Sequence, residues 1–328
     1  MNMSIFLDLI FTLLGLAILL GGGDLMVRGA AALARRLGIS TTVIGLTVVA
    51  FGTSAPELAV NVAAALRAGE ISFGNIIGSN LANIGLGIGL AAQIAPLTVE
   101  SIVVRREIPM MILATVAAVV AVLDPYLSNG PALYSRTESL LLLLFFAIFI
   151  YYNLVEVVQD RLNDLALQAA SETLPQKPLS IPVALGFFVL GVAGLVLGAE
   201  VTVRFAVSLA TTLGLPKAFI GFTLIALGTS LPEIAISIMA VRRGETDLLI
   251  GNIVGSNIFN LLFILGVTAT IRPVPVPEQG FSDLFMTLFL SLGLWFFAFS
   301  GKIRRRDGLF FLVAYLAYLG WKVTTLAY

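Results

Sequence analysis

The chain has 328 residues, of which 59% are apolar and only 12% are charged, and its 19 basic and 19 acidic residues cancel. A soluble domain carries about 25% charged residues, so this composition excludes a soluble globular protein and indicates a polytopic membrane protein. The zero net charge, without a basic cluster, argues against a nucleic-acid partner. The chain has no cysteine and no histidine, which excludes disulfides, thiolate metal sites and the usual zinc ligand.

Ten membrane spans are predicted along the chain. Each is an apolar run of about 20 residues, the length that an α-helix needs to cross a bilayer. The longest polar connection, residues 159–180, divides them five and five. We therefore expect an all-α polytopic membrane protein with one five-helix unit at 1–158, a cytoplasmic linker at 159–180 and a second unit at 181–328. The predicted spans are 4–26, 39–66, 73–96, 107–124, 138–158, 181–204, 215–241, 247–271, 281–300 and 307–326.

Two polar blocks interrupt the apolar spans, and each occurs twice. Residues 52–57 read Gly-Thr-Ser-Ala-Pro-Glu, and residues 228–233 repeat this with Leu in place of Ala. The second block, Gly-Asn-x-x-Gly-Ser-Asn-x-x-Asn, occupies residues 74–83 and recurs at 251–260. A fixed period between such blocks indicates a duplicated unit. Each repeat therefore spans about half of the chain.

The distribution of basic residues predicts the orientation of the repeats. With the N-terminus placed outside, thirteen of the nineteen Lys and Arg residues fall on the cytoplasmic side, as the positive-inside rule requires. Both termini are then outside the cell (inner) membrane. Because five is an odd number of spans, the second repeat enters from the opposite face. Inverted repeats place their shared elements near the bilayer midplane, as in many secondary transporters.

Each repeat places one carboxylate near the middle of a span, Glu57 in the second span and Glu233 in the seventh. An unpaired charge at the bilayer centre costs about 2.5–3.5 kcal/mol on insertion scales. No Lys or Arg occurs in the same blocks. A protonated Glu bonded to a neighbouring helix would explain one such residue, but two mirrored carboxylates favour a bound cation.

A proline precedes each of these glutamates. Pro56 and Pro232 remove one backbone donor each, and the carbonyls left without a partner belong to Gly52 and Gly228. We therefore expect broken helices at the midplane, since free carbonyls survive there only against a cavity or an ion. Hydroxyl and amide oxygens accompany them in both blocks. An all-oxygen set suits Ca²⁺ or Na⁺ and not Zn²⁺ or Cu²⁺.

Close helix packing is the competing explanation for the small residues, because Gly, Ala, Ser and Thr gather wherever membrane helices touch. For Ser79 and Ser256 we favour coordination, since polar residues recur beside them. Asn80 and Asn257 are instead interpreted as ties between helices. Two further pairs, at the ends of the first and sixth spans, are expected to be interfacial ion pairs: Asp24 with Arg28, and Glu200 with Arg204.

The duplicated blocks resemble the two α-repeats of the cation/Ca²⁺ exchanger superfamily, and the prokaryotic Na⁺/Ca²⁺ exchanger branch most closely. The resemblance covers nearly the whole chain, with α-repeat cores at about 41–96 and 217–273. It implies a monomeric antiporter, not an enzyme, that needs no cofactor and carries Ca²⁺ and Na⁺ by alternating access. Four adjacent cation sites would lie between spans 2, 3, 7 and 8, and spans 1 and 6 would form the gate.

The resemblance also implies roles for individual residues. Glu57 and Glu233 would be the main ligands of both cations, with oxygens from the two Thr residues beside them. Serines would line the Na⁺ sites, and two alanine carbonyls would complete the outer ones. The residues so implied are Glu57, Glu233, Thr53, Thr229, Ser54, Ser230, Ser79, Ser256, Asn83, Asn260, Ala50 and Ala226.

One position departs from part of the family. Asn260 stands where some relatives, including the K⁺-dependent branch, carry Asp. The site therefore has two formal negative charges, which one Ca²⁺ neutralises and three Na⁺ exceed by one. This charge balance is consistent with electrogenic 3:1 exchange and argues against K⁺ co-transport.

Three alternatives remain open from the sequence. An H⁺/Ca²⁺ antiporter could use the same glutamates, although such relatives usually place another acid in the second block. A cation channel is less favoured, since channels tend to be built from rings of repeated subunits. An intramembrane enzyme could use paired carboxylates, but no motif supplies a nucleophile or a substrate groove.

Overall fold

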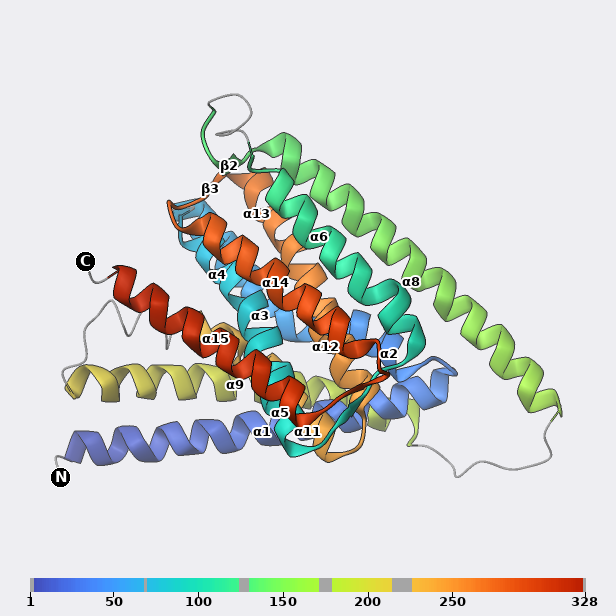
Figure 1. The fold of residues 1–328 in the computed structure, drawn as a ribbon. Helices are drawn as coiled ribbons and strands as arrows, with labels where there is room; N and C mark the ends of the chain where they lie inside the picture. The colour runs from blue at the N-terminus through green and yellow to red at the C-terminus, as the bar shows by residue number, and fades with distance from the viewer. Residues whose placement is uncertain (1–2, 68–69, 124–129, 171–178, 214–225, 327–328) are drawn as a thin grey trace.

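The computed structural model describes residues 3–67, 70–123, 130–170, 179–213 and 226–326. This part of the chain is almost entirely helical (Figure 1). Several helices contain π-helical turns, which are marked η. The helices are α1 (Met3–Leu37), α2 (Thr41–Ile44), η1 (Gly45–Val49), α3 (Ala50–Arg67), α4 (Glu70–Ala82), η2 (Asn83–Ile88), α5 (Gly89–Ile94), η3 (Val103–Glu107), α6 (Ile108–Val120), α8 (Arg136–Ala170), α9 (Ile181–Thr212), α11 (Ala226–Arg242), α12 (Thr246–Ile258), η5 (Phe259–Ile264), α13 (Leu265–Ile271), α14 (Gly280–Ala298) and α15 (Arg305–Leu326).

Every predicted span contains a helix. Among the described residues, eight helical segments are long and apolar enough to cross a membrane. The predicted spans 107–124 and 215–241 contain the shorter helices α6 and α11. The first part of the seventh span, and with it the start of the second α-repeat core, lies outside the described residues.

The predicted interruptions of the helices occur, but not at Gly52. Helix α3 continues through Pro56, and α11 continues through Pro232. The interruptions are the π-helical turns η1, η2 and η5, which lie immediately before α3 and at the end of the Gly-Ser-Asn blocks. Such turns insert a residue locally and are frequent at functional sites.

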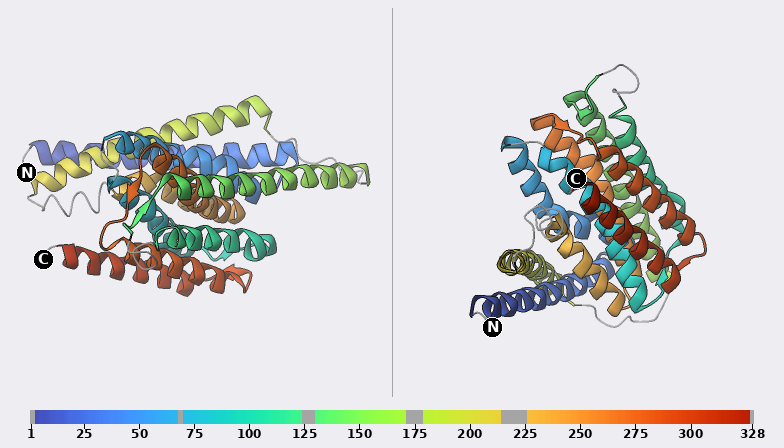
Figure 2. Two further views of the ribbon diagram at one scale, coloured as in Figure 1. Left: turned by 90° about the horizontal axis from the view of Figure 1, so that it is seen from above. Right: turned by 60° about the vertical axis from the view of Figure 1, so that its left-hand side comes forward.

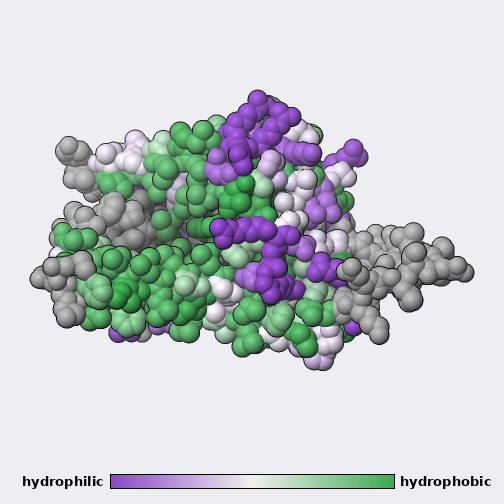
Figure 3. Space-filling view, turned by 90° about the horizontal axis from the view of Figure 1, so that it is seen from below, coloured by the Kyte–Doolittle hydropathy of each residue, from purple (hydrophilic) through white to green (hydrophobic). Residues whose placement is uncertain are grey.

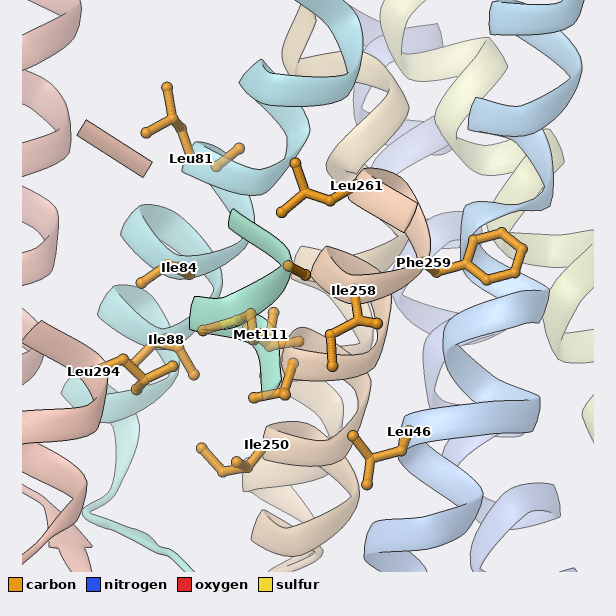
Figure 4. Close-up of a cluster of buried hydrophobic side chains, with 14 of the residues drawn as sticks. Leu46, Leu81, Ile84, Ile88, Met111, Ile250, Ile258, Phe259, Leu261 and Leu294 are labelled. Atoms are coloured by element: carbon orange, nitrogen blue, oxygen red, sulfur yellow. The ribbon is translucent and has the colours of Figure 1, made fainter. Parts of the chain in front are cut away.

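The helices that carry the polar blocks lie at the centre of the molecule. In the most apolar stretch of α12–η5–α13, 94% of the residues are buried, and in the span containing α4–η2–α5 the share is 83%. For α1, α8, α9 and α15 it is only 17–22%. Figure 4 shows aliphatic side chains from neighbouring helices, among them Leu46, Ile84 and Met111, packed around Ile250 and Ile258 of α12.

Two short strand pairs show that the repeats are inverted. Strand β1 (Leu97–Thr98) pairs with β4 (Lys302–Ile303), and β2 (Leu133–Tyr134) pairs with β3 (Val274–Pro275). By the duplication, β1 corresponds to β3 and β2 to β4, so the same pairing is formed twice. One copy follows α5 and the other follows α13, after helices that run in opposite directions through the molecule (Figure 1). This arrangement is the expected two-fold relation of inverted repeats.

Helices α1 and α9 form a long pair that crosses the other helices obliquely (Figures 1 and 2). Glycines allow their backbones to touch. A Cβ added at Gly22 would lie 2.6 Å from the backbone nitrogen of Leu195, and one at Gly191 would lie 2.4 Å from that of Met26. Close approach through small residues is the usual basis of helix association in membranes, where there is no hydrophobic driving force between helices.

Gly22→Ala is therefore expected to separate α1 from α9 and to lower both the melting temperature and the transport rate. Overpacking of this kind costs about 1–3 kcal/mol. Gly21→Ala is the matched control, because a Cβ at the adjacent Gly21 meets nothing within 4 Å. Melting curves and uptake rates of the two variants provide the measurement, and equal behaviour of both would contradict the expectation.

Of the two ion pairs predicted at the ends of the first and sixth spans, only one forms, and both positions lie within the longer helices α1 and α9. Arg28 bonds to Asp24 over 3.0 Å, and Arg243, the residue after α11, reaches the same carboxylate over 2.5 Å. Within the described residues, Glu200 and Arg204 form no such pair. Both are exposed, where ion pairs contribute little, and the Arg204 guanidinium lies over the ring of Phe205.

The surface of the molecule matches a membrane protein. Figure 3 shows a broad apolar area with hydrophilic residues gathered towards one end.

Helix α8 differs from the expectation, since it continues to Ala170 and makes the first part of the predicted 159–180 linker helical. Residues 171–178 of that linker lie outside the described part of the chain.

Candidate cation-binding site

The four helices with polar blocks pack against one another at the centre of the molecule. Helix α3 contacts α4, α11 and α12, and α11 contacts α4 and α12. Glu57 and Glu233 are at most 1% exposed. The polar residues that the two blocks bring to the same region are also buried. These residues are Thr53, Ser54, Ser79, Asn80, Asn83, Ser230, Asn252, Ser256, Asn257 and Asn260.

Thr53 links α3 to the second repeat. Its hydroxyl lies 3.2 Å from the carbonyl oxygens of Val49 and Ala50, one turn earlier, and 3.3 Å from Oδ1 of Asn252. Oγ of Ser256 lies 3.5 Å away. Three of these neighbours can only accept a hydrogen bond, so the hydroxyl proton is shared and the oxygens gather around one point.

Thr229 repeats this arrangement in the other half. Its hydroxyl donates to Oδ1 of Asn75 over 3.0 Å and lies 3.4 Å from Oγ of Ser79. Asn75 and Ser79 correspond to Asn252 and Ser256 in the duplication. Each repeat thus brings its Thr hydroxyl against the Asn and Ser of the other repeat.

The two glutamates differ in their partners. Ser54, one turn before Glu57 on α3, donates to Oε1 of Glu233 over 3.2 Å. Among the described residues, the equivalent Ser230 hydroxyl has no hydrogen-bond partner. The same is true of both carboxyl oxygens of Glu57 and of Oε2 of Glu233. A buried polar atom without a partner costs about 1–3 kcal/mol, and more if it is charged.

The ligand amides also keep oxygens free. Asn83 Oδ1 and Asn260 Oδ1 are buried and have no partner in the described part of the chain, while their Nδ2 atoms are bonded. The buried polar residues among those described include no Lys or Arg. The unpartnered atoms at the centre are therefore mainly oxygens, and a cation is the species that would satisfy them.

This donor set suits a weakly charged cation site. No group of three or more acidic or thiol ligands occurs among the described residues, so two carboxylates would act with neutral oxygens. Ca²⁺ takes six to eight oxygen ligands of these kinds. Of the carbonyl ligands that the sequence suggested, Ala50 O lies beside Thr53, and Ala226 is the first described residue of α11.

Two residues close to the glutamates were missed in the sequence. Asn61 donates to the carbonyl oxygen of Glu57 over 2.7 Å, and Ser237 donates to that of Glu233 over 2.8 Å. Both side chains lie four residues after the glutamate and hold its backbone in place. The signal was present, since a polar residue occurs at the same position in each repeat.

Comparison with known proteins agrees with this geometry. The family model for sodium/calcium exchanger proteins matches residues 7–155 and 183–324. The chain belongs to the sodium/calcium exchanger family. Its members are transporters, so this chain is an integral multi-pass membrane protein of the antiporter type and not an enzyme.

Individual relatives match over nearly the full length. The sodium/calcium exchanger MaX1 of Methanosarcina acetivorans is 34% identical over an alignment of 343 positions, gaps included, which covers 95% of this chain and 97% of that protein. The inner membrane protein YrbG of Escherichia coli is 35% identical, covering 85% and 84% of the two chains. A solved structure of the sodium-calcium exchanger NCX_Mj superposes with a TM-score of 0.80 at 32% identity, covering 96% of this chain and 98% of that one.

Proposed function

We propose that this member of the sodium/calcium exchanger family exchanges Na⁺ for Ca²⁺ at a group of adjacent cation sites centred on Glu57 and Glu233. The observation that carries the proposal is the group of buried oxygens without partners, which includes three of the four carboxyl oxygens. These atoms lie where two inverted repeats meet, and alternating access requires a site that both sides of the membrane can reach in turn.

The Na⁺ ligands are proposed to be the Thr and Ser hydroxyls through which the two repeats contact each other. Thr53 with Ser256, and Thr229 with Ser79, form two equivalent pairs, and each Thr lies one helical turn before a glutamate. Neutral hydroxyl, amide and carbonyl oxygens around two carboxylates suit several monovalent ions or one divalent ion. This property supports competition of Na⁺ and Ca²⁺ for the same oxygens.

The charge of the site supports electrogenic exchange that does not need K⁺. Asn83 and Asn260 are both neutral, so the two glutamates provide the only formal charges among the proposed ligands. One Ca²⁺ leaves the site neutral, whereas three Na⁺ leave one positive charge. Moving that charge across the membrane is worth about 2.3 kcal/mol per 100 mV.

The gate is proposed to be the α1–α9 pair. These helices have few buried residues, lie against α3 and α11, and touch each other through glycines.

Two of the basic residues predicted on the cytoplasmic side have acidic partners at one end of the molecule: Arg35 bonds Glu245 over 3.1 Å, and Arg243 bonds Asp24. We propose that this end faces the cytoplasm of the cell membrane and that both termini lie outside.

The test is ⁴⁵Ca²⁺ uptake into proteoliposomes loaded with Na⁺, compared with vesicles loaded with K⁺ and with vesicles under a pH gradient. We expect uptake only with internal Na⁺, faster when an imposed potential drives positive charge outward and unaffected by external K⁺. Uptake that follows the pH gradient and ignores Na⁺ would instead establish H⁺/Ca²⁺ exchange. Uptake without any counter-ion gradient would indicate a channel.

A further inference from the structure

Two asparagines cross-link the repeats beside the proposed ligands. Asn80 and Asn257 occupy equivalent positions and are fully buried. Asn80 donates its Nδ2 to the backbone carbonyl of Asn257 over 3.3 Å, and Asn257 donates to that of Asn80 over 3.4 Å. Because equivalent residues bond each other reciprocally, they lie on the axis that relates the two repeats.

Their side-chain oxygens hold the amides of the proposed ligands. Asn83 Nδ2 donates to Asn257 Oδ1, and Asn260 Nδ2 donates to Asn80 Oδ1, both over 3.0 Å. The connections are crossed, since each repeat holds the ligand amide of the other repeat. After these bonds, Asn83 Oδ1 and Asn260 Oδ1 remain buried, with no partner among the residues that the structure describes.

The network permits only one orientation of each amide. An Asn side chain has an oxygen that accepts on one branch and an NH₂ that donates on the other. A backbone carbonyl can only accept, so Asn257 must turn its Nδ2 to that carbonyl and its Oδ1 to Asn83. Asn83 must then donate its Nδ2 to this oxygen, which leaves its own Oδ1 available to a cation. A reversed amide would present a donor, which repels a cation.

We infer that Asn80 and Asn257 are positioning residues that fix which atom of each ligand amide is available to the cation. Asn257 acts through Asn83, and Asn80 acts through Asn260. The inference rests on the proposed cation site, but not on the identity of the counter-ion. It assigns to the Gly-Ser-Asn blocks a role beyond the tying of helices that their sequence suggests.

The crossed connections make the inference specific. Replacing Asn257 by Leu, which has a similar volume, removes the acceptor of Asn83 but keeps the backbone carbonyl that Asn80 uses. Asn80 therefore still holds Asn260. A residue that merely tied the helices together would affect both ligands alike.

The experiment is a double-mutant cycle on the purified protein in detergent, read by the rise in melting temperature on Ca²⁺ titration. We expect Asn257→Leu to weaken Ca²⁺ binding about ten-fold, as loss of one well-placed ligand would. The same substitution should add nothing in an Asn83→Ala background and should keep its full effect in an Asn260→Ala background. Asn80→Leu should show the opposite pattern.

Equal effects of Asn257→Leu in both backgrounds would overturn the inference. Asn257→Ala serves as a second variant. If neither variant folds while Asn83→Ala does, Asn257 is a structural residue and the inference is wrong. A wild-type protein stabilised by neither Ca²⁺ nor Na⁺ would overturn the proposed function as well. If the wild type binds Ca²⁺ but the effect of Asn257→Leu is the same in both backgrounds, this inference alone is overturned.

Discussion

Replacing Glu57 or Glu233 by Gln is expected to abolish Ca²⁺ transport. Each substitution keeps the size of the side chain but removes one of the two charges that balance Ca²⁺. A hydrogen bond to a charged group is worth about 1.5–3 kcal/mol, and an ion ligand in a dry site more. We therefore expect at least about 100-fold lower Na⁺-dependent ⁴⁵Ca²⁺ uptake in proteoliposomes.

The same substitutions should not harm the fold. Both carboxyl oxygens of Glu57 lack partners among the described residues, so the charged side chain destabilises the fold when no cation is bound. The Gln variants should melt at the wild-type temperature or above it in cation-free buffer and lose the stabilisation by Ca²⁺. Glu138→Gln, at the start of α8, is the control and should transport normally. Normal uptake by both site variants would refute the assignment.

The duplicated blocks made the central elements predictable from the sequence. Glu57 and Glu233 are conspicuous because carboxylates are rare in apolar spans, and their recurrence indicates a shared role. The inverted arrangement followed from an odd number of spans in each repeat. These inferences need only hydropathy and spacing, and α3 and α11 do contact each other in the structure.

Other features depend on tertiary contacts or on backbone atoms. The backbone donor that Pro56 lacks predicted a break of the helix at Gly52, whereas the π-helical turns lie in η1, η2 and η5. Hydropathy marks where the bilayer ends, not where a helix ends, so α8 continues to Ala170 through good helix formers. A polar residue four positions after each glutamate was visible in both repeats, but the partner of Asn61 is the backbone carbonyl of Glu57, which the repeat alone does not identify.

The hydroxyls of Ser79 and Ser256 should distinguish the Na⁺ sites from the Ca²⁺ site. Their contacts with Thr229 and Thr53 are long, at 3.4 and 3.5 Å, and hydrogen bonds between hydroxyls usually measure about 2.5–3.0 Å. Both oxygens are fully buried and only weakly satisfied. Such atoms gain more from an ion than from their present neighbours.

The double variant Ser79→Ala with Ser256→Ala is expected to raise the Na⁺ concentration for half-maximal exchange about ten-fold and to lower the Hill coefficient, because it removes two of the proposed Na⁺ ligands. A tenfold change corresponds to about 1.4 kcal/mol. The half-saturating Ca²⁺ concentration should change much less. Ser291→Ala is the matched control, since this buried hydroxyl of α14 donates to the carbonyl of Thr287 over 2.8 Å. Equal losses for both cations would place the serines in the Ca²⁺ site, and no loss for either would mean that they serve helix packing alone.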